Sequence, residues 1–188
     1  MEKALSNITV LDLTRVLAGP YCTMMLADYG ANVIKIEMPG KGDDTRAMGP
    51  KKNDYSMYYA YVNRGKKGIT LNLKSEEGKK LFLEMVKKAD VVVENYRPGV
   101  MDRLGLGYET LKELNPRLIY CSISAYGQVG PYAKRPGYDV IAQAVSGIMY
   151  MTGDPDGSPT KIGTALGDWV GGLTAFGMIG TAMYYRSV

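Results

Sequence analysis

The sequence predicts an α/β protein with a doubly wound, mostly parallel β-sheet of the Rossmann-like kind. Short apolar stretches recur along the chain, and segments with helical periodicity or helix-start signals separate most of them. One stretch, residues 90–94, carries three consecutive valines rather than alternating apolar and polar residues, which is typical of a strand buried on both faces. Strands that alternate with helices in this way favour a parallel sheet with helices on both faces.

The first two strands flank a helix. An apolar strand covers residues 8–13, and Pro20 then begins a helix that ends near Ala27, because proline is favoured in the first helical turn. A turn at residues 29–32 leads into an alternating strand at 33–37.

The middle of the chain predicts a long loop, a strand and a helix. Residues 39–53 are rich in Gly, Pro and charged residues, which indicates a loop. A strand follows at 68–73, and Ser75 caps a helix that continues through Lys88. The apolar face of this helix contains Leu81, Phe82, Met85 and Val86.

The remaining elements complete one domain without repeats or linkers. In chain order we expect the buried strand at 90–94, short helices near 99–104 and 108–114, a strand at 118–123, and helices at 138–147 and 168–186. The apolar segment 169–185 has about the minimum length of a membrane span, but four glycines interrupt it, so we expect a buried helix.

Composition narrows the chemistry. The chain has 188 residues, of which 46% are hydrophobic and 22% charged, enough for one domain with a core. A net charge of +4 suits an anionic small molecule better than nucleic acid. Two cysteines are too few for a disulfide scaffold or a zinc site, so we expect no metal and a reducing, cytoplasmic location. The complete absence of histidine excludes Ser-His-Asp and Cys-His chemistry.

Asp168 is the strongest candidate for a catalytic group. It follows the small-residue run 163–167 and opens the apolar segment that is expected to be helical. A carboxylate at a helix N-terminus is stabilised in its ionised form and lies near backbone amides that can stabilise an oxyanion. The alternative is that Asp168 is only an N-cap.

The expected strand ends predict an anion pocket. Several of the loops that follow the strands carry Arg or Lys beside Gly or Pro, and ligands bind at the carboxyl ends of the strands in such sheets. Neither a P-loop nor a Gly-x-Gly-x-x-Gly motif is present, so nucleotide hydrolysis and standard dinucleotide binding are not expected.

Six segments carry a family resemblance, and they run in order over essentially the whole chain. They are residues 10–20, 26–37, 42–46, 63–67, 93–99 and 163–168. Together they resemble the family III CoA-transferases, the family of formyl-CoA transferase and the carnitine CoA-transferases. The resemblance implies an acyl-CoA:carboxylate CoA-transferase with no tightly bound cofactor and with coenzyme A or acyl-CoA as substrate.

The resemblance also assigns residue roles. It places the family nucleophile on Asp168, which would form a mixed anhydride with the acyl group and then an aspartyl-CoA thioester. The CoA-binding positions of the family fall on Val16, Leu17, Ala18, Leu71, Lys74, Arg97, Arg103 and Tyr126. Core packing is the alternative for Val16, Leu17 and Leu71, and surface ion pairs of little energetic weight are the alternative for the two arginines.

Two further readings compete with the transferase. An acyl-CoA racemase of the same fold uses a Gly-His-Asp motif, but the matching positions here are Gly137-Tyr138-Asp139, and a tyrosine with a pKa of about 10 replaces the histidine poorly. The other reading is a non-catalytic CoA-binding fragment or one half of a split enzyme.

Chain length gives weight to that second reading, because family members are longer, carry a second small domain and form interlocked dimers. The resemblance therefore implies that residues 1–188 are the N-terminal part of the large domain. It implies a homodimer or a complementing chain as partner, and poor activity of the chain alone.

Overall fold

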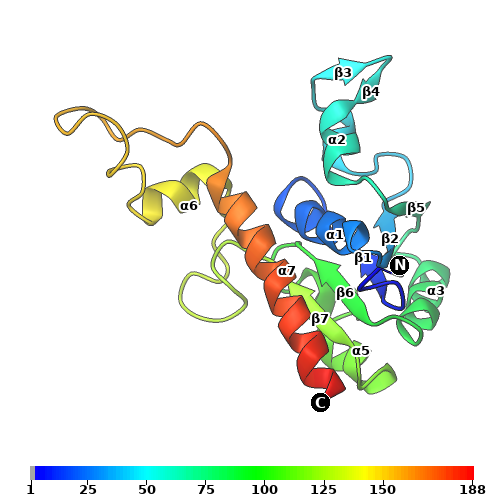
Figure 1. The fold of residues 1–188 in the computed structure, drawn as a ribbon. Coiled ribbons are helices and arrows are strands. Elements are labelled where there is room, and N and C mark those ends of the chain that lie inside the picture. Colours follow the sequence, from blue (N-terminus) through cyan, green and yellow to red (C-terminus); the bar gives the residue numbers. More distant parts are fainter. Residues whose placement is uncertain (1–2) are drawn as a thin grey trace.

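A computed structural model describes residues 3–188 and has a five-stranded parallel sheet at its centre (Figure 1). Its strands are β1 Thr9–Asp12, β2 Asn32–Glu37, β5 Lys67–Thr70, β6 Val91–Glu94 and β7 Ile119–Ser122. They are arranged in the order β5-β2-β1-β6-β7, with Leu11 of β1 paired to Ile34 on one side and Val92 on the other. The predicted doubly wound α/β fold is confirmed.

Eight helical segments and a hairpin complete the described part of the chain. The helices are α1 Ala18–Asp28, η1 Asp44–Ala47, α2 Met57–Val62, α3 Glu76–Val86, α4 Val100–Arg103, α5 Tyr108–Leu114, α6 Asp139–Val145 and α7 Leu166–Ser187. Strands β3 Lys51–Lys52 and β4 Tyr55–Ser56 form a separate antiparallel hairpin. The hairpin and the α6 segment extend from the sheet as two arms (Figure 1).

Two apolar cores lie on opposite faces of the sheet because successive strand residues point to opposite sides. Val10, Val91 and Val93 face α1 and α7, whose buried members include Leu26 and Ile179. The alternate strand residues face α3, α4 and α5 and join the second core. Its buried members include Leu11, Val92, Phe82, Val86, Met101 and Leu111.

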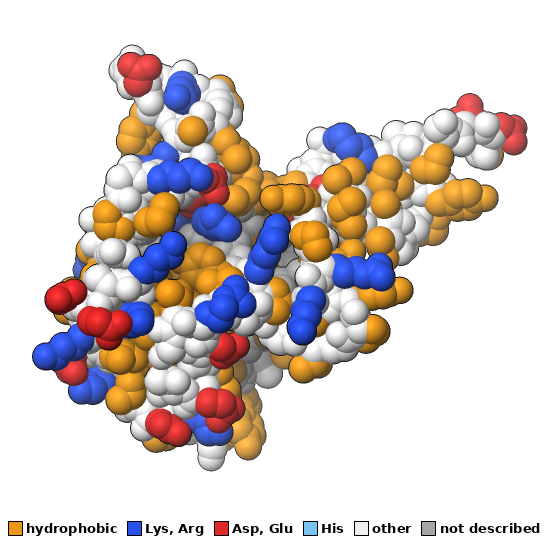
Figure 2. Space-filling model, turned by 180° about the vertical axis from the view of Figure 1, so that it is seen from behind, with side chains coloured by type: hydrophobic (Ala, Val, Ile, Leu, Met, Phe, Trp, Pro, Cys, Tyr) orange, Lys and Arg blue, Asp and Glu red, His pale blue; other side chains and the backbone are white. Residues whose placement is uncertain are grey.

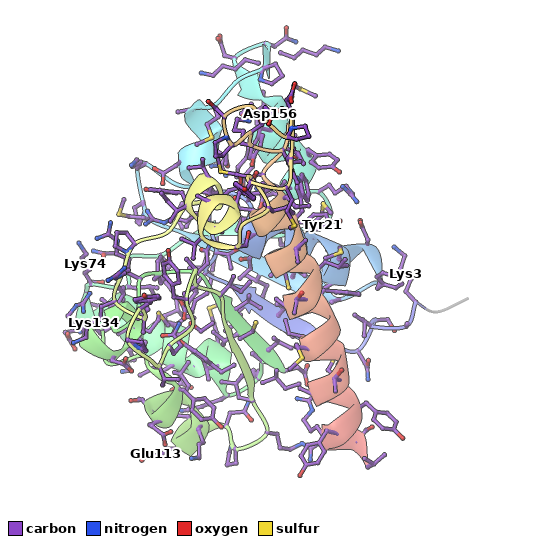
Figure 3. The ribbon with its side chains drawn as sticks, turned by 90° about the vertical axis from the view of Figure 1, so that its left-hand side faces the viewer. Lys3, Tyr21, Lys74, Glu113, Lys134 and Asp156 are labelled. Atoms are coloured by element: carbon purple, nitrogen blue, oxygen red, sulfur yellow. The ribbon has the colours of Figure 1, made fainter. Side chains whose placement is uncertain are left out.

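Helix α7 lies directly on α1 at a glycine. A Cβ atom on Gly172 would lie 2.6 Å from the carbonyl oxygen of Ala18, so only glycine permits this approach. One turn earlier, the Trp169 ring meets the Tyr21 ring edge to face at a centroid distance of 4.4 Å, and Figure 3 shows Tyr21 beside α7. This contact fixes the first turn of α7 beside the first turn of α1.

Several boundaries differ from the sequence prediction. The predicted loop at 39–53 contains η1 and the first strand of the hairpin, because Asp43 caps a short helical turn through the backbone N–H of Thr45. Helix α2 was not predicted, since its aromatic residues are weak helix formers; Ser56 caps it by accepting the N–H of Tyr59 at 3.1 Å. The strand predicted at 68–73 is β5, which ends at Thr70.

The start of α7 corrects the reading of Asp168 as an N-cap. The helix begins at Leu166, and Ala165 occupies the N-cap position without a side-chain cap bond. Asp168 therefore lies within the first turn, where its carboxylate still benefits from the positive end of the helix dipole. Residues 3–188 contain no helix whose length and hydropathy would let it cross a membrane, α7 included.

Candidate active site

The candidate site is a cleft at the point where the strand order reverses. Loops after β1, β6 and β7 meet the first turns of α6 and α7 around a cavity of about 390 Å³. Strand order β5-β2-β1 runs one way from β1 and β6-β7 runs the other way, and ligands of such sheets bind at that switch point. The volume lies in the range of small-molecule sites.

Asp168 lies in the wall of this cleft and is half-buried. Burial raises the pKa of its carboxyl group, and the nearby Asp139 raises it further. Within residues 3–188, no hydrogen bond or ion pair occupies the Asp168 carboxylate. A carboxylate without a structural partner at the edge of a cleft can act as a nucleophile or base.

Asp139 and Gln143 of α6 fix the turn that carries Asp168. Oδ1 of Asp139 accepts the N–H of Gly167 at 2.7 Å, and Oδ2 accepts Nε2 of Gln143 at 2.7 Å. The buried Gln143 also donates to the carbonyl of Thr164 and accepts the N–H of Ile162. The Gly167 amide is therefore already used by Asp139 and is not free to stabilise an oxyanion.

Tyr58 of α2 is a second residue near Asp168 that the sequence did not identify. Burial raises the pKa of its hydroxyl group, and the charges of Asp168 and Asp43 raise it further. The tyrosine is thus held in its neutral form, in which the O–H can donate a hydrogen bond.

Arginines supply positive charge to the cleft from three loops. Arg15, Arg97 and Arg135 line it, and Figure 2 shows Lys and Arg side chains around the hollow between the two arms. The Asn95 side chain makes two hydrogen bonds to the backbone of Arg15: Oδ1 accepts its N–H at 2.9 Å, and Nδ2 donates to its carbonyl at 2.8 Å. Arg15 is also paired with Asp44 at 3.4 Å, and guanidinium groups around a cleft suit phosphate or carboxylate ligands.

The cleft brings together five of the nine predicted site residues. Val16, Leu17, Ala18, Arg97 and Asp168 all line it, although the Leu17 side chain is buried. Leu71 does not line the cleft; it is partly buried and packs against the core that contains Phe82 and Val86 of α3.

The other three predicted residues lie outside the lining of the cleft. Tyr126 contacts Tyr132 edge to face at 5.8 Å, and its ring would lie 3.3 Å from a Cβ on Gly137, which does line the cleft. Arg103 is the last residue of α4, and its guanidinium group lies beside Gly99, where a Cβ atom would be 3.2 Å from Nη1. Lys74 is exposed and projects on the same side of the molecule as Lys134 (Figure 3).

A larger hollow of about 1070 Å³ lies beside β7, but its chemistry fits a ligand site less well. Its central acid, Glu94, is already engaged, because it accepts the N–H of Tyr96 at 2.7 Å and the hydroxyl of Ser122. Of the predicted site residues only Arg97 reaches it. The smaller cleft is therefore the better candidate.

Two of the three signals that the sequence analysis missed can be recognised once the structure is known. Asp139 and Gln143 are four residues apart, which places both on one face of α6. Asn95 immediately follows β6 and so belongs to the edge where ligands bind. Tyr58 lies in a helix that was not predicted, and no local pattern connects it to Asp168.

Known proteins match this chain over nearly its whole length. The model of CoA-transferase family III matches residues 5–188. Acetyl-CoA:oxalate CoA-transferase of Acetobacter aceti is 58% identical, with 96% of this chain and 46% of that protein covered. Human succinyl-CoA:glutarate CoA-transferase is 52% identical, and the match covers 94% of this chain and 41% of that protein. This chain thus spans about half the length of these relatives.

A solved structure agrees with the fold as well as with the sequence. A CAIB/BAIF family protein from Brucella suis superimposes with a TM-score of 0.95 at 45% identity. The match covers 100% of this chain and 50% of that one. The sheet, the two helical layers and the cleft at the switch point therefore lie within a region that the two proteins share.

Proposed function

The chain belongs to CoA-transferase family III, and on that basis we propose that it carries the acyl-CoA site of an acyl-CoA:carboxylate CoA-transferase with Asp168 as the nucleophile. The observation that carries this proposal is the Asp168 carboxylate, without a hydrogen-bond partner in residues 3–188, in the wall of a cleft with three arginines. An anionic ligand with a reactive carbonyl group fits this combination.

The proposed reaction begins at Asp168. One of its carboxylate oxygens attacks the thioester carbon of acyl-CoA, the C–S bond breaks, and CoA leaves as a thiolate while an acyl-aspartyl anhydride forms. The thiolate then attacks the Asp168 carbonyl carbon of the anhydride, which releases the donor acid as a carboxylate and leaves an aspartyl-CoA thioester. An incoming carboxylate reverses both steps and departs as the new acyl-CoA.

The surroundings of Asp168 support this role. Its raised pKa makes the carboxylate a stronger nucleophile than an exposed one, provided that the pH is high enough to ionise it. The neutral hydroxyl of Tyr58, whose pKa responds to the charge of Asp168, is the donor proposed to stabilise negative charge on a carbonyl oxygen. Neither step requires a histidine, a metal or a tightly bound cofactor.

The arginines and the β1–α1 loop would hold the CoA portion. Arg15, Arg97 and Arg135 supply charge for the phosphates, and residues 16–18 supply backbone and apolar surface for the pantetheine arm. Lys74, Arg103, Tyr126 and Leu71, which do not line the cleft, remain proposed contacts of CoA. We further propose that the acting unit is a cytoplasmic homodimer or a complex with a complementing chain.

The names of the relatives guide the choice of substrates for a test. Acetyl-CoA and succinyl-CoA are offered as donors, and oxalate, glutarate and mesaconate as acceptors. We expect CoA to bind the chain in calorimetry, and chromatography to detect a new acyl-CoA with a matching donor and acid. Failure of both CoA and acyl-CoA to bind a folded chain would contradict the proposal.

A further inference from the structure

Val16 has a backbone conformation that its residue type disfavours. Its φ angle is +69°, in the left-handed region, and it lines the cleft between Arg15 and Leu17. For a β-branched residue such a conformation is a genuine outlier, because the branched side chain crowds the backbone. Strain of this kind persists only where the surroundings enforce it.

Asp43 and Lys35 hold Val16 and its loop in this conformation through hydrogen bonds to the backbone. Oδ1 of Asp43 accepts the N–H of Val16 at 3.2 Å, and Oδ2 accepts Nζ of Lys35 at 2.9 Å. Lys35 also donates to the carbonyl of Thr14 at 2.8 Å. The side chains of the pair are each only 1% exposed, so one buried ion pair holds the β1–α1 loop at two points.

The loop that carries Asp43 is itself fixed. Glu37 accepts the N–H of Asp43 at 2.7 Å, and Thr45 donates its N–H and its hydroxyl to the same Asp43 oxygen that holds Val16. At Gly42, with φ of +66°, a Cβ atom would lie 2.6 Å from the Glu37 carboxylate. The segment 42–46, which no step of the proposed reaction uses, is thus built to aim one carboxylate at Val16.

We propose that Asp43, paired with Lys35, is a positioning residue of the acyl-CoA cleft, which holds Val16 in its left-handed conformation before the ligand arrives. Asp43 is buried and does not line the cleft, so it acts through the backbone of residues 14–17. A loop that is already ordered does not have to lose conformational freedom on binding, and this raises affinity. The inference deepens the proposed function and rests on it only for the identity of the ligand.

The test compares Asp43→Asn with Thr45→Val. Asp43 uses one carboxylate oxygen for Val16 and the other for Lys35, whereas an asparagine has only one side-chain oxygen. If that oxygen accepts from Lys35, the NH₂ group of the asparagine faces the N–H of Val16, and two donors oppose each other. Thr45→Val is the matched control, because it removes a 2.8 Å hydrogen bond to the same Asp43 oxygen from an equally buried site. The N–H of residue 45 and Nζ of Lys35 still hold the Asp43 carboxylate, so Val16 keeps its acceptor. Calorimetry measures CoA affinity, and hydrogen–deuterium exchange measures the order of residues 14–18.

We expect Asp43→Asn to bind CoA about tenfold more weakly and to exchange faster at residues 14–18, with Thr45→Val close to wild type in both. Adding Val16→Gly to Asp43→Asn should recover affinity, since glycine reaches a positive φ freely. Wild-type affinity in Asp43→Asn, equal losses in both variants, or no recovery on adding Val16→Gly would overturn the proposal.

Two further outcomes are decisive. If Asp43→Asn does not fold, hydrogen–deuterium exchange of the wild type without ligand is the deciding measurement. Slow exchange at residues 14–18 before CoA is added supports a loop that is already ordered, and slow exchange only after CoA is added refutes it. If wild type does not bind CoA, the proposed function fails, while the difference in exchange between wild type and Asp43→Asn still tests the positioning role.

Discussion

Gly167 donates its backbone N–H to Oδ1 of Asp139 at 2.7 Å, and this bond ties α6 to the first turn of α7. Burial is the main cause of the raised pKa of Asp168, and the negative charge of the same Asp139 is the second cause. One side chain therefore both places the candidate nucleophile and adjusts its ionisation. This dual role leads to a prediction about pH.

We expect Asp139→Asn to extend activity to lower pH. Asp168 reacts as a carboxylate, so activity falls as the pH drops below its pKa. Removing the negative charge of Asp139 removes one cause of the raised pKa, so the acid limb of the profile for CoA release from acyl-CoA should shift to lower pH. Asp156→Asn, on the exposed loop after α6, is the control. An unchanged or upward-shifted limb in Asp139→Asn would rule out this coupling.

We expect Gly172→Ala to separate α7 from α1 and to impair the site. The new methyl group would lie 2.6 Å from the Ala18 carbonyl, which forces the first turn of α7 and Asp168 away from the β1–α1 loop. CoA affinity should fall severalfold and the melting temperature should fall by several degrees. Gly177→Ala lies on the same helix in open space and should be neutral or slightly stabilising. Equal behaviour of the two variants would contradict the close-contact argument.

We expect Arg97→Ala to weaken CoA binding about tenfold at low salt, with a smaller difference at high salt. Arg97 lines the cleft and is exposed enough for its charge to be screened. Arg117→Ala removes an equal charge from an exposed position that does not line the cleft, and should leave affinity unchanged. Titration calorimetry at two salt concentrations measures both, and similar losses for both arginines would indicate a general charge effect instead.

We expect stability to fall steeply in acid. Burial opposes the ionisation of both Asp12 and Glu37. At Asp12 the positive charges of Lys66 and Lys35 outweigh the effect of burial, and at Glu37 hydrogen bonds from Arg46 outweigh it. Both pKa values are about 2 in the folded chain, against 3.8 and 4.5 for free groups. Because the folded values are the lower ones, their stabilisation is complete above pH 4.5 and is lost as the pH falls towards 2. Urea unfolding measured from pH 7 to pH 2.5 should record the loss, and a constant free energy of unfolding across that range would contradict it.

The fold could be predicted because its strands carry local signals. The three valines of β6 indicate burial on both faces, and Pro20 marks the first turn of α1. The start of α7 could not be placed as well, because the turn before it is held by Gln143 and Asp139 from a distant helix rather than by a cap of its own. Helix α2 was not predicted for a similar reason, since its buried Tyr59 contacts Arg46 of η1 and Tyr55 of the hairpin instead of belonging to an apolar stripe.

The site could be predicted in part. Asp168 stood out through its place before the apolar segment, and the family resemblance pointed to residues 16–18; all four line one cleft in the structure. The segment 42–46 stood out as well, but its contact with Val16 spans 27 residues and joins two loops, which no spacing rule connects. The left-handed conformation of Val16 could not be anticipated, since its residue type argues against it.

The central claim is that Asp168 is the nucleophile, and intact-mass spectrometry tests it most directly. Wild type and Asp168→Ala are incubated with a panel of acyl-CoAs, and each sample is then treated with hydroxylamine, which cleaves a thioester. We predict a covalent adduct with the mass of CoA less one water on wild type alone, removed by hydroxylamine. An adduct of the same mass on Asp168→Ala, or none on a wild-type chain that binds acyl-CoA, would contradict the account.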